Sequence, residues 1–322
     1  MGNSKTLIKT NLFRSDALQK ILAFASLIFL IIIFSIASPN FLKWDNITGI
    51  LLATSVNGIL AIGVTFIIIT GGIDLSIGTI MSLSAVMTGI FIVNMGLPVP
   101  VGIVLGILTG AFCGMVNGFA ISKLTLPPFI ATLGMMMVTK GLALIISGSK
   151  PVYFMDIKGY NKIAMTSIGG IPMAVIIFLL LAVVAHFVLS NTVLGRYNFA
   201  LGSNEEATRL SGINTANWKI LIYTIGGMSA GIAGVVLSSR LNSAQPAVGS
   251  GYELEAIAAA VIGGTSLNGG EGGVLGTVIG AFIMTVLTNG LRILSVPQEW
   301  QTVVTGCIVI LAVYMDIVRR RK

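Results

Sequence analysis

One carboxylate stands within an almost wholly apolar part of the sequence. Asp74 lies in TGGIDLSIGT, residues 70–79, with two glycines before it and a serine and a glycine after it. A charge at the centre of a membrane costs at least about 2.5 kcal/mol, so such a residue usually faces a protein interior. The glycines favour a break between two helices, where freed backbone groups can bond to Asp74 or Ser76. We therefore expect Asp74 to cap the helix that follows, with direct contact to a substrate as the alternative.

A polar stripe runs along the apolar segment before this aspartate. Thr54, Asn57 and Thr65 are spaced so that they share one face of a helix. Neutral hydroxyl and amide groups suit a neutral polyhydroxylated substrate, which needs hydrogen bonds and no ion pair. Hydrogen bonding between packed spans explains the stripe equally well. Together with Asp74 and Ser76, the stripe defines the candidate substrate path.

The sequence lacks the residues that a phosphate-binding, metal-binding or catalytic site would need. The sequence contains no G-x-x-x-x-G-K-[ST] phosphate-binding loop and no cluster of metal ligands. Its single histidine, His186, lies in an apolar run, and no histidine stands where a serine nucleophile would need a base. Cys113 and Cys307 also lie in apolar segments and are interpreted as packing residues. We therefore expect no catalytic residue, no metal site and no enzyme activity in this chain.

A polar loop beyond the middle of the chain carries helix signals. It reads GRYNFALGSNEEATRLSGINTANWK, residues 195–219, and Ser203 and Glu206 have the S-x-x-E spacing of a capping box. Acids are favoured in a first helical turn, and Gly212 is placed to end the helix about two turns later. The pattern predicts one short capped helix, which is either an ordinary loop helix or a docking element for a cytoplasmic partner. The docking hypothesis rests on Ser203, Asn204, Glu205, Glu206, Ala207, Arg209 and Gly212.

The composition indicates which elements must position these residues. Of 322 residues, 55% are hydrophobic and only 9% are charged, against roughly 25% in a soluble domain. Residues 21–37 contain no charge, and segments 172–189 and 303–315 are similar. Because about 18 apolar residues span a bilayer, the sequence predicts an all-α polytopic membrane protein. The run at 21–37 is long for a cleaved signal and lacks an A-x-A site, so we interpret it as a membrane anchor.

About ten apolar segments divide the chain. The eighth is too short to span alone, so we expect an interrupted or re-entrant helix whose non-helical backbone is buried in protein. The segments lie near 21–38, 48–70, 77–95, 98–122, 128–147, 172–190, 220–240, 255–266, 272–291 and 301–317.

The distribution of basic residues predicts the orientation. Basic residues gather on the cytoplasmic side of membrane proteins, which accounts for the net charge of +8 without a nucleic-acid partner. They lie at both ends of this chain: Lys5, Lys9, Arg14, Lys20, Arg319, Arg320, Arg321 and Lys322. Both termini are therefore predicted to be cytoplasmic, which places the loop at 191–219 inside and the loop at 148–171 outside.

Glycines recur every four residues within several segments. On a helix such residues share a face, and small residues on one face let helix backbones approach closely in lipid. We expect these faces to pack helix against helix, as they do in helical membrane proteins of any function. The two longest series are Gly102, Gly106, Gly110, Gly114 and Gly118, and Gly272, Gly276 and Gly280.

Two glycine-rich octets resemble each other weakly. GGIDLSIG at 71–78 and GGTSLNGG at 263–270 both follow an apolar run and precede a predicted span. Transporters are often built from repeats with interrupted helices, and the substrate path lies at the interruption. Two octets alone do not establish a duplication, so the repeat stays a hypothesis.

The polar loop also carries a family resemblance. EATRLSG at 206–212 resembles the E-A-A-x-x-x-G loop of bacterial ABC-importer permeases, with Thr208 in place of the second alanine. SPNFL, GIDLSIG, LGRYNFALGSNEEATRLSGIN and SSRLNSAQPAVGSGYELEAIAAAVIGGTSLNGGEG extend the likeness. Nearly the whole chain is thus similar to the ribose-type monosaccharide permeases. In that family the loop forms a coupling helix that enters a groove on the ATPase.

The resemblance implies a multi-pass importer subunit of a bacterial inner membrane, surrounded by lipid. Two copies would form the path, an extracytoplasmic binding protein would deliver the sugar, and a cytoplasmic ATPase that binds ATP and Mg would drive alternating access. This chain would itself hold no cofactor. Ribose is the first candidate. The alternatives are xylose, galactose, allose, autoinducer-2 or branched-chain amino acids as cargo, or an independent secondary carrier.

The same resemblance divides the chain into three parts. Residues 1–20 would be a cytoplasmic segment, residues 21–317 a single transmembrane permease domain, and residues 318–322 a basic cytoplasmic tail.

Overall fold

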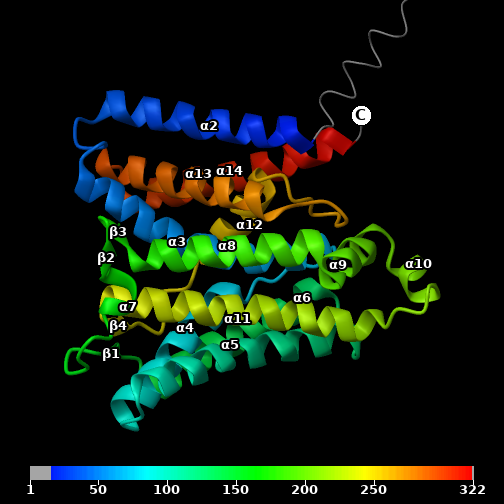
Figure 1. The fold of residues 1–322 in the computed structure, drawn as a ribbon, viewed down its shortest axis with the longest axis horizontal. Coiled ribbons are helices and arrows are strands. Elements are labelled where there is room, and N and C mark those ends of the chain that lie inside the picture. The colour runs from blue at the N-terminus through cyan, green and yellow to red at the C-terminus, as the bar shows by residue number, and fades with distance from the viewer. Residues whose placement is uncertain (1–15, 321–322) are drawn as a thin grey trace, which may run out of the picture.

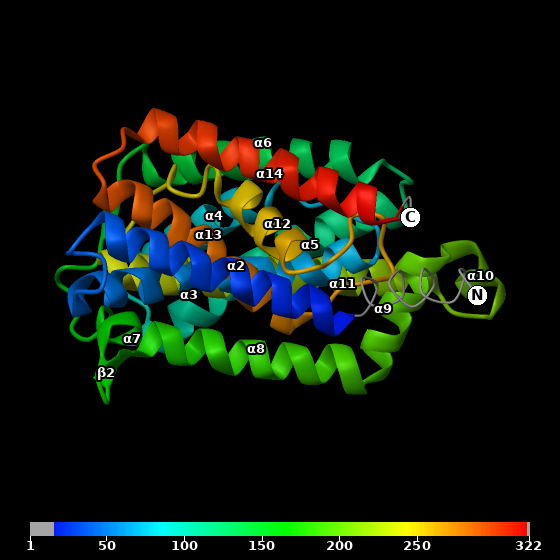
Figure 2. The ribbon, with the colours of Figure 1, turned by 90° about the horizontal axis from the view of Figure 1, so that it is seen from above.

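The protein is a bundle of long helices, as its computed structural model shows for residues 16–320 (Figures 1 and 2). Nine helices within this range are long and apolar enough to cross a membrane. The all-α, multi-pass membrane fold predicted from the sequence is therefore confirmed. The helices are α2 Asp16–Ala37, α3 Trp44–Ile69, α4 Ile77–Gly89 with its π-helical extension η1 Ile90–Asn94, α5 Val99–Ser122, α6 Pro128–Ser147, α7 Lys162–Met165, α8 Met173–Asn191, α9 Val193–Ser203, α10 Glu205–Leu210, α11 Thr215–Leu241, α12 Tyr252–Ile262, α13 Val274–Ile293 and α14 Gln298–Arg320.

Short strands gather at one end of the bundle, on the left in Figure 1. They form two antiparallel pairs: β1 Val152–Tyr153 with β4 Ser243–Ala244, and β2 Ser167–Ile168 with β3 Ile171–Pro172. Side chains tie this end to α11, since the hydroxyls of Tyr160 and Ser238 lie 2.7 Å apart. The segment between α6 and α8 is therefore an ordered cover over this end of the bundle.

The eighth predicted segment is α12, and its 11 residues reach only about 16 Å. The first described residues of α2 and the last of α14 lie at the same end of the bundle, together with α10 (Figure 1). Nine full crossings would leave the two ends on opposite sides. The tenth passage is therefore made by α12 together with the non-helical segments 242–251 and 263–273, which flank it.

Several of the basic residues that predict the orientation lie outside the described residues. Lys5, Lys9, Arg14, Arg321 and Lys322 belong to that part of the chain. The cytoplasmic location of both ends therefore stays a prediction, as does the division of the chain at residues 20 and 317.

The core is built around α3. Every residue of this helix from Thr54 to Ile69 is buried, because α8, α11, α12 and α13 pack around it. A helix that is hydrophobic on all sides lies either in lipid or in a protein core, and here the neighbouring helices of the chain surround it. The polar residues of α3 are consequently enclosed as well.

The first glycine series brings α5 into close contact with two helices. An added Cβ at Gly102 or Gly106 would collide with side chains of α4 and η1. An added Cβ at Gly110, Gly114 or Gly118 would collide with the backbone of α11. The series is therefore divided between two neighbours rather than facing one.

The second series differs from its prediction at its first member. Gly276 and Gly280 lie on α13, where a Cβ would strike the carbonyl oxygens of Gly263 and Ala259. Gly272 precedes α13 and has φ +153°, so it belongs to the loop and not to a helix face. The reason is that α13 begins only at Val274, after the non-helical segment that follows α12.

Candidate functional site

The break between α3 and α4 is built around Asp74, whose side chain is fully buried. Asp74 Oδ1 accepts hydrogen bonds from Ser76 N (2.8 Å) and Ser76 Oγ (2.5 Å). Asn117 Nδ2, on α5, donates to Ser76 Oγ over 2.8 Å. These three side chains form one polar network where the two helices are interrupted.

The capping role predicted for Asp74 needs correction. Helix α4 begins at Ile77 after the N-cap residue Ser76, and no side chain caps its first turn. Asp74 stands two residues before that N-cap, so it reaches only the N–H of Ser76. The carboxylate therefore shapes the turn that leads into α4 instead of satisfying the first N–H groups of the helix.

Side chains from two further helices hold the same break. Thr132 Oγ1, on α6, lies 3.3 Å from Ile73 O, and Thr139 Oγ1 donates to Thr79 Oγ1 over 2.8 Å. Tyr223, on α11, places its hydroxyl against Gly72, where a Cβ would collide with it. Sequence reasoning missed these partners and Asn117. The available signal was a set of polar residues inside apolar segments.

Two polar atoms at the break lack a hydrogen-bond partner within the described part of the chain. They are Asp74 Oδ2 and the hydroxyl of Tyr223. Both side chains are buried, with exposed fractions of 0% and 1%. Leaving a buried polar group unpaired costs about 1–3 kcal/mol, so these two atoms are unusual features of the core.

The predicted stripe on α3 divides into two parts. Thr65 Oγ1 donates to Ala61 O and lies 2.7 Å from Thr277 Oγ1 on α13, so it links two packed helices. Thr54 Oγ1 and both polar atoms of the Asn57 side chain have no such partner among the described residues. All three side chains are buried. The stripe is therefore closed to solvent in this conformation, and only its first part has unused hydrogen-bonding capacity.

The predicted short helix is α10, which projects beyond the end of the bundle (Figure 1). Asn204 precedes it, and Asn204 Oδ1 accepts a hydrogen bond from Ala207 N over 2.9 Å. The predicted Ser203–Glu206 capping box is therefore wrong. Ser203 is the last residue of α9, and Glu206 pairs with Arg209 at 2.7 Å. The extra helix α9 displaces the cap by one residue.

The rest of α10 is satisfied locally. The Arg209 guanidinium donates hydrogen bonds to the Glu206 carboxylate, and these bonds raise the pKa of Arg209. Thr208, at the position that departs from the E-A-A pattern, donates from Oγ1 to Asn204 O over 2.8 Å. Gly212 follows the helix with φ +87°, as expected for a glycine that ends a helix.

The exposed surface of α10 includes a residue that sequence reasoning missed. Leu210 is 77% exposed and stands among charged side chains on a helix that projects from the bundle. No periodic pattern marks it, because a six-residue helix is too short to show one. An exposed leucine among charges suits contact with another protein.

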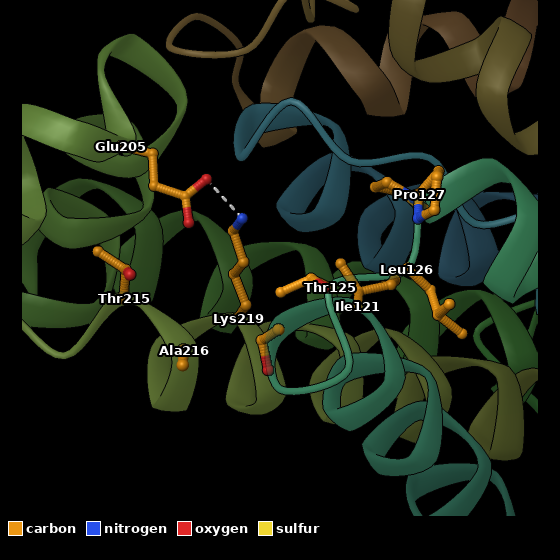
Figure 3. A pocket seen from close by; sticks show the side chains of 10 residues that line it. Ile121, Thr125, Leu126, Pro127, Glu205, Thr215, Ala216 and Lys219 are labelled. Carbon is orange, nitrogen blue, oxygen red and sulfur yellow. Dashed lines mark hydrogen bonds and ion pairs between the residues drawn. The ribbon is translucent and has the colours of Figure 1, made fainter.

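A pocket lies beside the base of α10 (Figure 3). Glu205 and Lys219 form an ion pair on one side of it, with Thr215 and Ala216 nearby, and the loop between α5 and α6 forms the other side. The volume is about 340 Å³. The residues from the loop side are Ile121, Ser122, Thr125, Leu126, Pro127 and Pro128.

The two glycine octets meet near the C-terminal end of α9, where a Cβ on Gly269 would collide with Gly71 N. Gly270 N donates to Ile69 O over 2.8 Å. A Cβ on Gly202, in α9, would collide with both of these groups. The structure thus brings together the end of α3, the segment after α12 and the end of α9, although it does not test whether the octets are a repeat.

Comparisons with known proteins agree over most of the chain. A family model described as branched-chain amino acid transport system / permease component matches residues 46–313. The ribose import permease protein RbsC of Bacillus subtilis (strain 168) is 42% identical over 300 residues, which cover 93% of each chain. The D-allose transport system permease protein AlsC of Escherichia coli (strain K12) is 38% identical over 294 residues, covering 91% of this chain and 90% of that protein.

A third relative is more distant. The xylose transport system permease protein XylH of Escherichia coli (strain K12) is 33% identical over an alignment of 370 residues, covering 96% of this chain and 94% of that protein. No solved structure matches this chain significantly.

Proposed function

We propose, on the premise that this chain belongs to the family of branched-chain amino acid transport system / permease components, that it is the membrane-spanning permease subunit of an ATP-binding-cassette importer for a monosaccharide. The observation that carries this proposal is the 42% identity over 93% of the chain to a ribose import permease. The chain is a transporter component of the inner membrane and not an enzyme. Ribose is the first candidate cargo, and allose and xylose follow because permeases named for them also align over nearly the whole length.

Helix α10 is proposed as the coupling helix that docks on a separate ATPase. Its projection from the bundle, its local capping and the exposed Leu210 support this role. The ATPase would bind ATP and Mg, and this chain would bind neither. A substrate-binding protein would deliver sugar to the opposite face, where the segment 148–171 covers the bundle.

The substrate path is proposed to run along α3 beside α12, within a complex of two copies of the chain. Thr54 and Asn57 support this, because their polar atoms are buried without partners among the described residues. A neutral sugar offers hydroxyls that can both donate to and accept from such groups. Movement of the short helix α12, which packs against α3, would expose them.

Transport by reconstituted vesicles tests the function. The permease, its ATPase and its binding protein are placed in proteoliposomes, and uptake of ribose, allose, xylose and leucine is measured with and without ATP. We expect ribose uptake that requires all three components. Concentrative uptake by the permease alone, driven by a sodium or proton gradient, would contradict the proposal, and ATP-dependent uptake of leucine alone would reassign the cargo.

A pair of variants distinguishes residues that line the substrate path from residues that only pack helices together. Asn57→Leu is expected to reduce sugar uptake at least about fivefold while membrane insertion is kept, since it removes an amide that has no protein partner. Thr65→Val is the matched control, because Thr65 already bonds to Thr277 and serves packing. Equal uptake by both variants would remove Asn57 from the path.

A further inference from the structure

The coupling helix α10 is carried by two helices that both reach the break between α3 and α4. On one side, α9 ends at Ser203, and Gly202 lies against Ile69 O at the end of α3. On the other side, the ion pair between Glu205 and Lys219 ties α10 to the first turns of α11. A displacement of α10 therefore has two direct routes to the buried break.

The contacts along α11 lead from Lys219 to one polar group, the hydroxyl of Tyr223. Tyr223 follows Lys219 by four residues and so lies on the same face of α11, one turn deeper in the bundle. Its hydroxyl lies against Gly72, which stands in the break two residues before Asp74. Glycine at position 72 is what allows this approach, because any side chain would occupy the place of the hydroxyl.

The two unpaired atoms at the break are chemically complementary. Asp74 Oδ1 is already occupied by the two bonds from Ser76, which leaves Oδ2 as the free acceptor. The Tyr223 hydroxyl is a free donor. No other side chain of the described range bonds to either atom. The present conformation therefore lacks a bond that a shift of α11 against the break would form.

We infer that Tyr223 and Asp74 are positioning residues that join α11 to the α3–α4 break in a second conformation of the transport cycle, through a hydrogen bond from the Tyr223 hydroxyl to Asp74 Oδ2. The inference rests on the proposed function, because it assigns to α11 the transmission of movement from a docked ATPase. The bond favours the second conformation, while two unpaired buried atoms disfavour the present one. A docked partner then needs to supply less energy to shift the population.

The test measures sugar imported per ATP hydrolysed by the complete reconstituted complex. Tyr223→Phe removes only the hydroxyl, and we expect ATP hydrolysis within about twofold of the original protein but about fivefold less sugar per ATP, as the loss of one net hydrogen bond predicts. Tyr160→Phe is the matched control. It removes a buried hydroxyl that bonds to Ser238, near the other end of α11, and it should leave the ratio unchanged.

A second measurement tests the inference independently of which substrate is transported. Thermal unfolding is followed for Tyr223→Phe, Asp74→Asn and the double variant, each in complex with the ATPase and a non-hydrolysable ATP analogue, so that the second conformation is populated. If the two groups act on each other, the two changes are not additive. Additive unfolding shifts, an unchanged ratio in Tyr223→Phe, or an equal loss in Tyr160→Phe would each overturn the inference. Absence of ATP-dependent uptake by the original complex would instead overturn the proposed function.

Discussion

Two helix starts in this molecule are each introduced by an acid or amide side chain, and they are stabilised in opposite ways. Before α10, Asn204 bonds to Ala207 N, and the neighbouring ion pair joins Glu206 to Arg209 within the same helix. Before α4, Asp74 bonds to Ser76, and the network continues to Asn117 on another helix. The first is exposed, and apart from the ion pair between Glu205 and Lys219 its bonds lie within α10 and its cap. The second is buried and depends on α5, α6 and α11.

This difference indicates how the molecule can combine rigidity with movement. An exposed element whose side-chain bonds are mostly internal can move as a body, and its one ion pair to α11 passes that movement on. An element that is bonded to two neighbouring helices and packed against a third changes only when those neighbours move. The exposed helix is suited to docking a partner. The buried break is suited to changing conformation when the helices around it shift.

The largest expected effect is at the buried start. Asp74→Leu leaves the Ser76 N–H and hydroxyl without their acceptor, so we expect a loss of about 3 kcal/mol or more in the free energy of unfolding. Asp74→Asn keeps an acceptor oxygen at the same place and should retain most of the stability. Thermal unfolding in detergent measures both. A Leu variant as stable as the Asn variant would show that the break does not depend on this network.

A second, smaller effect is expected at the exposed start. Leu210→Asp should leave unfolding unchanged, because the side chain is largely solvent-exposed, but should weaken ATPase binding about 30-fold, the loss of a contact worth about 2 kcal/mol. Co-purification and titration with the ATPase measure this. Met155→Asp is the control, because Met155 is also largely exposed but lies in the 148–171 segment at the other end of the bundle. Undiminished binding by Leu210→Asp would remove α10 from the docking surface.

The smallest effect is expected from the cap of α10. Asn204→Ala removes one bond to Ala207 N, so the helix should lose about 1 kcal/mol locally while global unfolding stays unchanged. Amide hydrogen exchange of residues 205–210 measures the change. Asn204→Asp should preserve protection, since aspartate also accepts this bond. If Asn204→Ala lowered the global melting temperature as much as Asp74→Leu, the two helix starts would not differ as described.

Sequence reasoning correctly predicted those parts of the fold that depend only on residues close together in the chain. Apolar runs predicted the spans, and the short eighth run predicted α12. Gly212 was correctly placed at the end of the exposed helix, because only its own φ angle is needed there. The capping residue was misplaced by one position, because Asn204 and Ser203 are both good caps and the extent of α9 decided between them.

The candidate site was reached only in part. Asp74 and Ser76 stood out as polar residues beside glycines, and they are bonded to each other. Asn117 and Tyr223 lie 41 or more residues away from Ser76 in the sequence, and no local pattern links them to the break. The stripe on α3 was found by its spacing, yet spacing did not separate Thr65, which packs, from Asn57, which lacks a partner.

By itself, the sequence determined that this protein lies in a membrane as a helical bundle, that one helix is too short to cross, and that a capped polar helix stands outside the bundle. These properties depend on the hydrophobicity and backbone preferences of neighbouring residues. Only the tertiary structure decided which polar atoms meet. Whether a buried group is bonded or unpaired depends on helices brought together by packing, and for Asp74 and Tyr223 that packing leaves one polar atom of each without a partner among the described residues.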